Sequence, residues 1–192
     1  MKRLILAVAL ALAGCGSSPK THFYTLVPRP PAQADPAPVS KIPLRLGRIT
    51  LPAALDRSGL VIFGPGTAVS VSDQDRWAAP LKDLVRSALT ADLRQRLGPS
   101  RVLDPNVAAP AGKLLIVTLD IRRFAAQASG DVVLAADWTL VRTTRNVQHV
   151  LGVQQATLLA PSGSTGGKAV SEAMSDLLGK LANRIAEPLS RW

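Results

Sequence analysis

The sequence predicts an α/β (α+β) domain, a two-layer sandwich of about six mainly antiparallel strands with two helices packed on one face. Three apolar, β-rich segments follow one another after residue 113, which is typical of an antiparallel meander. One segment on each side of this meander repeats apolar residues at helical spacing. A hydrophobic content of 47% is enough for a buried core, and 192 residues favour one domain with a tail.

Residues 1–14 are predicted to be a removable signal peptide. Lys2 and Arg3 precede an uncharged apolar run that is shorter than the roughly 20 residues of a membrane-spanning helix. The run ends in Leu-Ala-Gly-Cys, which resembles a bacterial lipobox and makes Cys15 the acylated N-terminus. Stable membrane anchoring needs two lipid signals or more, which the implied diacylglyceryl and N-acyl (palmitate-type) chains supply. The alternative is a buried free cysteine after ordinary cleavage.

Residues 15–43 are interpreted as a lipidated N-terminus, a short strand near residues 22–27 and a proline-rich tether. Six of the fifteen prolines lie between residues 28 and 43. Because proline fixes φ and lacks an N–H group, this stretch is expected to be a semi-rigid linker. A single α/β domain is expected over residues 44–192.

The first half of that domain contains short strands followed by a helix. The predicted strands cover residues 42–51, 60–63 and 67–71, the last two flanking a Gly-Pro-Gly turn. Ser72 and Asp75 have the spacing of a capping box, which predicts a brief turn. A helix is predicted to begin near Pro80 and to end at Gly98.

The second half contains the meander and the second helix. The meander strands are predicted over residues 114–124, 132–141 and roughly 147–159. In the middle strand, Trp138 belongs to the apolar face, whereas Asp137 and Thr139 belong to the other. A Ser/Gly-rich loop then leads into an amphipathic helix that ends near Pro188.

The composition argues against an enzyme, and no catalytic, metal or cofactor site is predicted. One cysteine forms neither an intramolecular disulfide nor a thiolate zinc cage, and two histidines give little material for acid–base chemistry. His22 and His149 have no cysteine or glutamate at ligand spacing. Ser162 and Ala169 stand where a P-loop requires glycine and a hydroxyl residue.

The formal net charge of +10 indicates attraction to polyanions. The secretory leader and the lack of a basic patch interleaved with aromatic residues argue against nucleic acid. Arg122 and Arg123 lie near the end of a predicted strand, as do Arg142 and Arg145. These arginines are either solvated charges that discourage edge-to-edge pairing or contacts to anionic lipid.

Two tryptophans are candidate contact residues. Trp77, three residues before Pro80, is interpreted as packing against the start of the first helix, with a partner interface as the alternative. Trp192 ends the given sequence and is a candidate contact to a partner or to lipid.

Several stretches in order resemble the PqiC-type family of ABC-transport auxiliary lipoproteins. They are the lipobox, Phe23-Tyr24-Thr25-Leu26, Leu51-Pro52-Ala53-Ala54-Leu55-Asp56-Arg57, Arg76-Trp77-Ala78-Ala79-Pro80-Leu81 and the strand ending in Ala136-Asp137-Trp138. The family usually has Tyr-Tyr in the first strand and an acidic residue before the helix-start proline. Phe23 and Ala79 stand at those positions here.

The resemblance implies a non-catalytic lipoprotein on the periplasmic face of the outer membrane that serves an MCE-domain system for lipid traffic. It also implies docking on a needle-like periplasmic MCE protein, assembly into a homo-oligomeric ring, and a separate ATPase and permease. Two alternatives stay open: a structural or assembly lipoprotein of another outer-membrane complex, and a periplasmic hydrolase.

Overall fold

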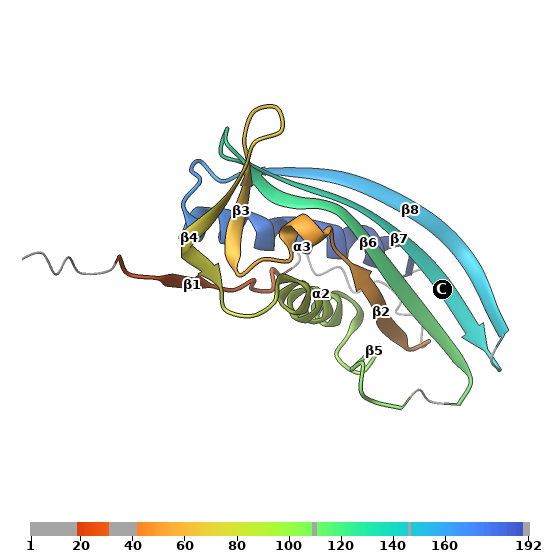
Figure 1. The fold of residues 1–192 in the computed structure, drawn as a ribbon. Helices are drawn as coiled ribbons and strands as arrows, with labels where there is room; N and C mark the ends of the chain where they lie inside the picture. The colour runs from red at the N-terminus through yellow and green to blue at the C-terminus, as the bar shows by residue number, and fades with distance from the viewer. Residues whose placement is uncertain (1–18, 31–41, 109–110, 146, 190–192) are drawn as a thin grey trace, which may run out of the picture.

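A computed structural model describes residues 19–30, 42–108, 111–145 and 147–189, in which eight strands form one sheet and two long helices cover one of its faces (Figure 1). The elements are β1 (His22–Tyr24), β2 (Leu44–Thr50), the 3-10 turn η1 (Ala53–Leu55), β3 (Gly59–Phe63), β4 (Val69–Trp77), α2 (Leu81–Leu97), β5 (Val102–Leu103), β6 (Lys113–Gln127), β7 (Asp131–Thr144), β8 (Val147–Pro161) and α3 (Gly167–Leu189). The predicted fold class is confirmed.

The strand count is eight rather than about six. One additional strand is β1, which the sequence placed outside the domain but which pairs in parallel with β4. The other is β5, whose two residues are too few to show the alternation by which strands are recognised. The brief turn predicted at Ser72–Asp75 was also wrong. The Ser72 Oγ accepts the Asp75 N–H at 2.9 Å, but both residues lie within β4.

The meander forms the long half of the sheet. β7 pairs antiparallel with β6 and with β8, and these two ladders contain most of the paired residues. Figure 1 shows the three strands arching over α3. The other edge of β6 pairs with two strands in parallel. β2 pairs with residues 115–120 of β6, and β3 pairs with residues 126–127. The sheet edges are therefore β8 at one end and the short β1 and β5 at the other.

Alternation along the meander separates a buried face from an outer one. Leu119, Phe124, Leu134 and Trp138 are buried, and all lie in the core beneath the helices. Neighbouring positions such as Asp120 are exposed on the opposite face. In the described structure no further layer covers that outer face (Figure 1).

Residues 25–30 form a strap that crosses the helix layer after β1. Leu26 is buried, and the Val27 N–H donates to the Ser175 hydroxyl in α3 at 3.1 Å. The Arg29 N–H donates to the Asp92 carboxylate in α2 at 2.7 Å, and the Arg29 side chain pairs with Asp176 at 2.7 Å. Residues 28–30, which the sequence assigned to the tether, are thus fixed against both helices.

Arg101 joins the two ends of the domain. Its Nε donates to the Ile42 carbonyl at 3.1 Å and its Nη2 to the Leu189 carbonyl at 3.0 Å. Burial lowers the pKa of this guanidinium from its ordinary value. The second bond satisfies one of the carbonyl groups that the end of α3 leaves without a helical partner.

Gly59 in β3 is required by a close approach of β4. A Cβ atom at this position would lie 2.2 Å from the Ser72 carbonyl oxygen and 2.8 Å from Cγ1 of Val71. We expect Gly59→Ala to lower the free energy of unfolding by about 1–3 kcal/mol, because the backbone of β4 must move. Urea denaturation followed by circular dichroism measures the change.

Gly152→Ala in β8 is the matched control, since nothing lies within 4 Å of its added Cβ. Both variants replace a strand glycine by alanine, so they change strand propensity alike. The free energy of unfolding of the Gly152→Ala variant is expected to stay within about 0.5 kcal/mol of that of the unmodified chain. Equal losses in the two variants would contradict the packing explanation.

Candidate functional site

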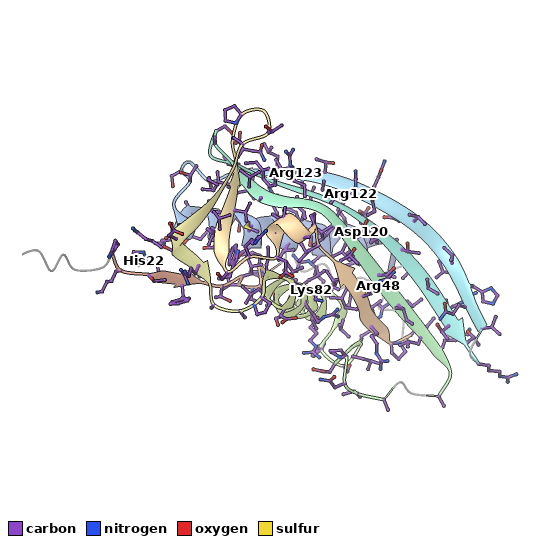
Figure 2. The ribbon with its side chains drawn as sticks, viewed as in Figure 1. His22, Arg48, Lys82, Asp120, Arg122 and Arg123 are labelled. Atoms are coloured by element: carbon purple, nitrogen blue, oxygen red, sulfur yellow. The ribbon has the colours of Figure 1, made fainter. Side chains whose placement is uncertain are left out.

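The outer face of the sheet carries a charged cluster centred on Arg122 (Figure 2). The Nε of Arg122 lies 2.8 Å from Oδ2 of Asp137, and its Nη2 donates to Oδ1 at 3.2 Å. Asp137 is directly opposite Asp120 in the β6–β7 ladder, and Asp120 accepts a hydrogen bond from the Thr50 hydroxyl. Because facing carboxylates repel, the main role visible for Arg122 is to neutralise one member of this pair.

Arg123 is placed differently from its neighbour. A register shift between Ile121 and Arg123 brings both arginines out of the core, with Arg123 opposite Ala135. Its guanidinium carbon lies 5.5 Å from the centre of the Phe63 ring, at cation–π distance. Arg123 is exposed and forms no ion pair with any described residue, so its charge is available to an external anion.

Two open hollows adjoin this cluster and share Arg48 and Thr50. The larger, about 680 Å³, lies between β2 and the start of α2 and includes Lys82 and Asp83. The smaller, about 430 Å³, lies on the outer face and includes Asp120 and Asp137. Charges of both signs line them, which suits a polar protein surface better than a selective anion site.

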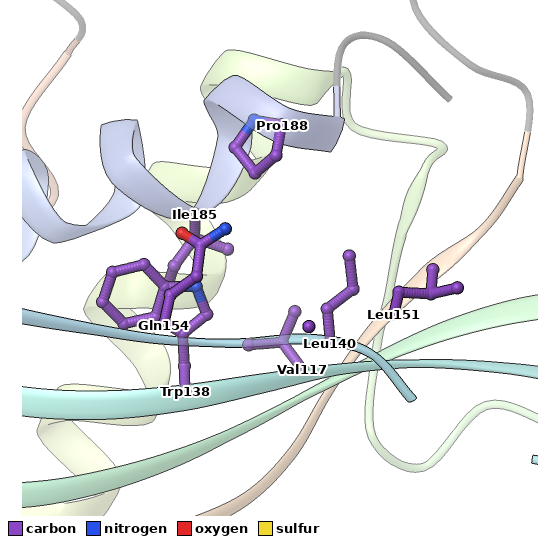
Figure 3. A pocket seen from close by; sticks show the side chains of 8 residues that line it. Val117, Trp138, Leu140, Leu151, Gln154, Ile185 and Pro188 are labelled. Carbon is purple, nitrogen blue, oxygen red and sulfur yellow. The ribbon is translucent and has the colours of Figure 1, made fainter. Parts of the chain in front are cut away.

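The apolar cavity in Figure 3 lies between the meander and the last turns of α3. It has a volume of about 120 Å³ and is lined by Val117, Trp138, Leu140, Leu151, Gly152, Gln154, Ile185 and Pro188. The polar side-chain groups among its lining residues are the Gln154 amide and the Trp138 indole N–H, and no lining residue is a nucleophile or an ionisable group. The cavity can accept a small apolar group but offers nothing for acid–base chemistry.

The helix-start residues lie on the core side of the sheet. Trp77, the last residue of β4, is 6% exposed and packs near Leu81 and Phe124. The Pro80 carbonyl accepts the N–H groups of Asp83 at 2.9 Å and Leu84 at 3.1 Å, which begins α2. Trp77 thus belongs to the core, whereas Arg122 and Arg123 are exposed on the outer face. Cys15 and Trp192 lie outside the described residues.

The histidines are not brought together. The Nδ1 of His22 lies 3.7 Å from Oδ1 of Asp75, and His149 is exposed on β8 at the other end of the sheet. Burial, followed by the charge of Asp75 and a hydrogen bond to it, raises the pKa of the Tyr24 phenol. Within the described ranges, no three metal-ligating side chains form a group that could hold an ion. None of the helices in those ranges is both long and apolar enough to cross a bilayer.

Sequence reasoning missed the exposed aromatic residue on β1. Phe23 is 65% exposed, the largest fraction for any aromatic side chain in the described structure. The sequence did contain a signal for this exposure. Side chains alternate along a strand, so Phe23 lies on the face opposite to that of its partly buried neighbour Tyr24. Arg48 was also missed, and no pattern in the sequence distinguishes it from other strand arginines.

Comparison with known proteins finds similarity to transport lipoproteins. The family model described as an ABC-type transport auxiliary lipoprotein component matches residues 24–186. The intermembrane transport lipoprotein PqiC of Escherichia coli K12 is 27% identical over 141 residues, which are 72% of this chain and 73% of that protein. The PqiC protein of Shigella flexneri gives the same values.

Two crystal structures share the fold. An uncharacterized protein aligns with a TM-score of 0.68 and 19% identity, covering 89% of this chain and 99% of its own. The protein XCC0632 from Xanthomonas campestris aligns with a TM-score of 0.64 and 18% identity, covering 86% and 92%. At these identities the likeness concerns the fold alone.

Proposed function

Because the chain belongs to the family of ABC-type transport auxiliary lipoprotein components, as the resemblance predicted, we propose that it serves an MCE-type ABC system that moves lipids between the inner and outer membranes. Its role there is non-catalytic. It docks on the periplasmic MCE needle protein while the ATPase and permease are separate chains. The observation that carries this proposal is the family match over residues 24–186, which includes nearly all of the described domain.

The lipid anchor at Cys15 places the domain on the periplasmic face of the outer membrane. The sequence around Cys15 supports this placement, with its cationic start, apolar run and lipobox-like end. The name of the PqiC relative agrees, since that protein is an intermembrane transport lipoprotein.

Edge strand β8 supports assembly of several copies into a ring. It has 15 residues without lysine, arginine, aspartate or glutamate, and among the described elements it pairs only with β7. Val150, Val153 and Leu159 are 66%, 69% and 57% exposed. Exposed edges are usually protected by charges, and copies that share a net positive charge associate best through an uncharged surface. β8 is therefore the proposed contact between neighbouring copies.

A charge on this edge tests the contact. We expect Val153→Lys to convert the assembly into monomers, measured by light scattering after size-exclusion chromatography in mild detergent, because an edge lysine disfavours strand pairing. Val107→Lys is the matched control, since Val107 is 52% exposed and lies outside β8. An unchanged assembly in the Val153 variant would exclude β8 as the contact.

The function itself is tested by affinity purification of the full-length, acylated protein from its own cells, with mass spectrometry of the proteins that co-purify. An MCE-domain protein in stoichiometric amount is the expected result. Recovery of a different outer-membrane complex, unaffected by loss of the MCE protein, would instead favour a structural or assembly lipoprotein.

A further inference from the structure

We propose that the outer face of β1, β3 and β4 rests on an anionic lipid surface when the protein is anchored. The face, called here the Phe23 face, consists of Phe23, Phe63, Val69, Val71, Arg76 and Arg123. The inference rests on the proposed acylation of Cys15 but not on the identity of any protein partner.

The strand register makes the Phe23 face continuous. Phe23 is opposite Arg76 in the parallel β1–β4 pair, and Arg76 is opposite Gly59 in the β3–β4 pair. Directly opposed residues project to the same side of a sheet. Val71 covers the space above Gly59, since its Cγ1 would be 2.8 Å from an added Cβ. The row thus runs without interruption from Phe23 to Val71.

The row continues toward the β3–β4 hairpin. Val69 lies two residues before Val71 and is opposite Phe63. The Phe63 ring stacks against the guanidinium of Arg123 at 5.5 Å (Figure 2 labels Arg123). The other side of these strands faces the core, where Tyr24 and Trp77 pack.

The exposed side chains of the Phe23 face mix apolar and cationic groups, because Arg76 lies between Phe23 and the Val71 position and Arg123 lies beside Phe63. Phe23, Val69 and Val71 are 65%, 49% and 47% exposed. Arg76 and Arg123 are exposed, and in the described ranges neither forms an ion pair. The Nε of Arg76 donates to the backbone carbonyl of Asp73 at 3.1 Å. Apolar side chains flanked by arginine bind the interface of an anionic membrane, where burial and charge attraction act together.

The anchor brings this face, rather than another, to the membrane. Phe23 is eight positions after Cys15, and eight extended Cα–Cα steps span at most roughly 28 Å. β1 is fixed to β4, and the strap behind it is tied to both helices, so the tether cannot lengthen by detachment of β1 and the Phe23 edge stays within this distance of the anchor. β8 lies at the opposite edge of the sheet. The arginines of the Phe23 face and the short distance to the anchor favour lipid, rather than a protein, as the partner that covers this face.

Site-specific labelling of the acylated full-length protein tests the orientation. Cys15 is the only cysteine and its acylated thiol does not react, so an introduced cysteine can be labelled alone. We would place an environment-sensitive fluorophore on Phe23→Cys, Val71→Cys and, as a matched control, Val107→Cys, which is 52% exposed and outside the face. The proteins are reconstituted in vesicles of phosphatidylethanolamine and phosphatidylglycerol that contain doxyl-labelled lipid.

We expect lipid-borne doxyl to quench the probes at 23 and 71 several-fold more than the probe at 107. Replacing phosphatidylglycerol by phosphatidylcholine, or adding salt, should reduce that difference. Equal quenching at the three positions overturns the inference while leaving the anchor intact. Shielding of probes 23 and 71 from both doxyl lipid and aqueous iodide also overturns it, because a protein then covers the face. A protein that does not float with the vesicles refutes the anchor and this inference, whereas the MCE partnership is tested separately.

Discussion

Replacing Asp92 by alanine is expected to lower the free energy of unfolding by about 3–5 kcal/mol, measured by urea denaturation. Asp92 is 0% exposed, accepts the Arg29 N–H at 2.7 Å and pairs with Nη1 of Arg96 at 3.2 Å. The Arg96 side chain is itself only 5% exposed. Truncation leaves a buried guanidinium without its counter-charge and removes the acceptor that holds the strap on α2.

The same carboxyl group gives the stability a defined pH dependence. Burial raises the pKa of Asp92 above its ordinary value of 3.8, although hydrogen bonds and charge from Arg29 and Arg96 oppose the shift. The folded chain therefore holds this proton more strongly than the unfolded chain. The contribution of Asp92 to stability is largest below pH 3.8 and falls as the pH rises through the raised pKa.

One variant separates the charge of Asp92 from its shape, and a second variant tests the exposed partner of Arg29. Asp92→Asn keeps the shape and cannot titrate, so its stability curve should lack the fall that Asp92 contributes. Asp176→Asn removes the exposed partner of Arg29 and is expected to change stability by no more than about 1 kcal/mol. An Asp92→Asn curve with the same pH slope as the unmodified chain would show that Asp92 is not the titrating group.

The meander and the helices were predictable because their signals are local. Alternation over residues 132–141 identifies the buried face of β7, and helical spacing after Pro80 identifies α2. The meander strands extend up to three residues beyond their predicted ends, whereas α2 begins and ends just inside its predicted limits. Pairing between neighbouring antiparallel strands then follows from short connections.

The strap was not predictable, because its partners are distant in the chain. Arg29 meets Asp92 across 63 residues, and Val27 meets Ser175 across 148. The proline content around them indicated an extended chain but gave no information on where that chain docks. A buried aspartate in a helix also carries no local signature, since only tertiary packing removes it from water.

The Phe23 face was not predictable from the sequence for a related reason. Phe23 and Val71 come together only through the parallel register of β1 on β4 and the irregular register of β3 on β4. A shift of one residue would turn Phe23 to the other face. Arg122 and Arg123 were recognised as exposed charges, but their separate roles depend on the register shift in β6.

Replacing Cys15 by serine is expected to move the protein from the membrane fraction to the soluble periplasmic fraction. Each buried methylene of an acyl chain contributes about 0.8 kcal/mol to membrane binding, so loss of the attached chains removes far more than any surface contact supplies. Membrane fractionation followed by immunoblotting measures the distribution. Ser17→Ala, two residues away, is the matched control and should stay with the membrane.

Any membrane binding that remains in the Cys15→Ser protein measures the contribution of the protein surface without the acyl anchor. If the Phe23 face contacts lipid, a small membrane-bound fraction remains at low salt and is released at high salt, because exposed charges are screened within about 10 Å at 0.1 M salt. Adding Phe23→Ser should remove that fraction. Retention of most Cys15→Ser protein in the outer-membrane fraction at high salt would contradict lipid anchoring and would point to a protein receptor that holds the domain there.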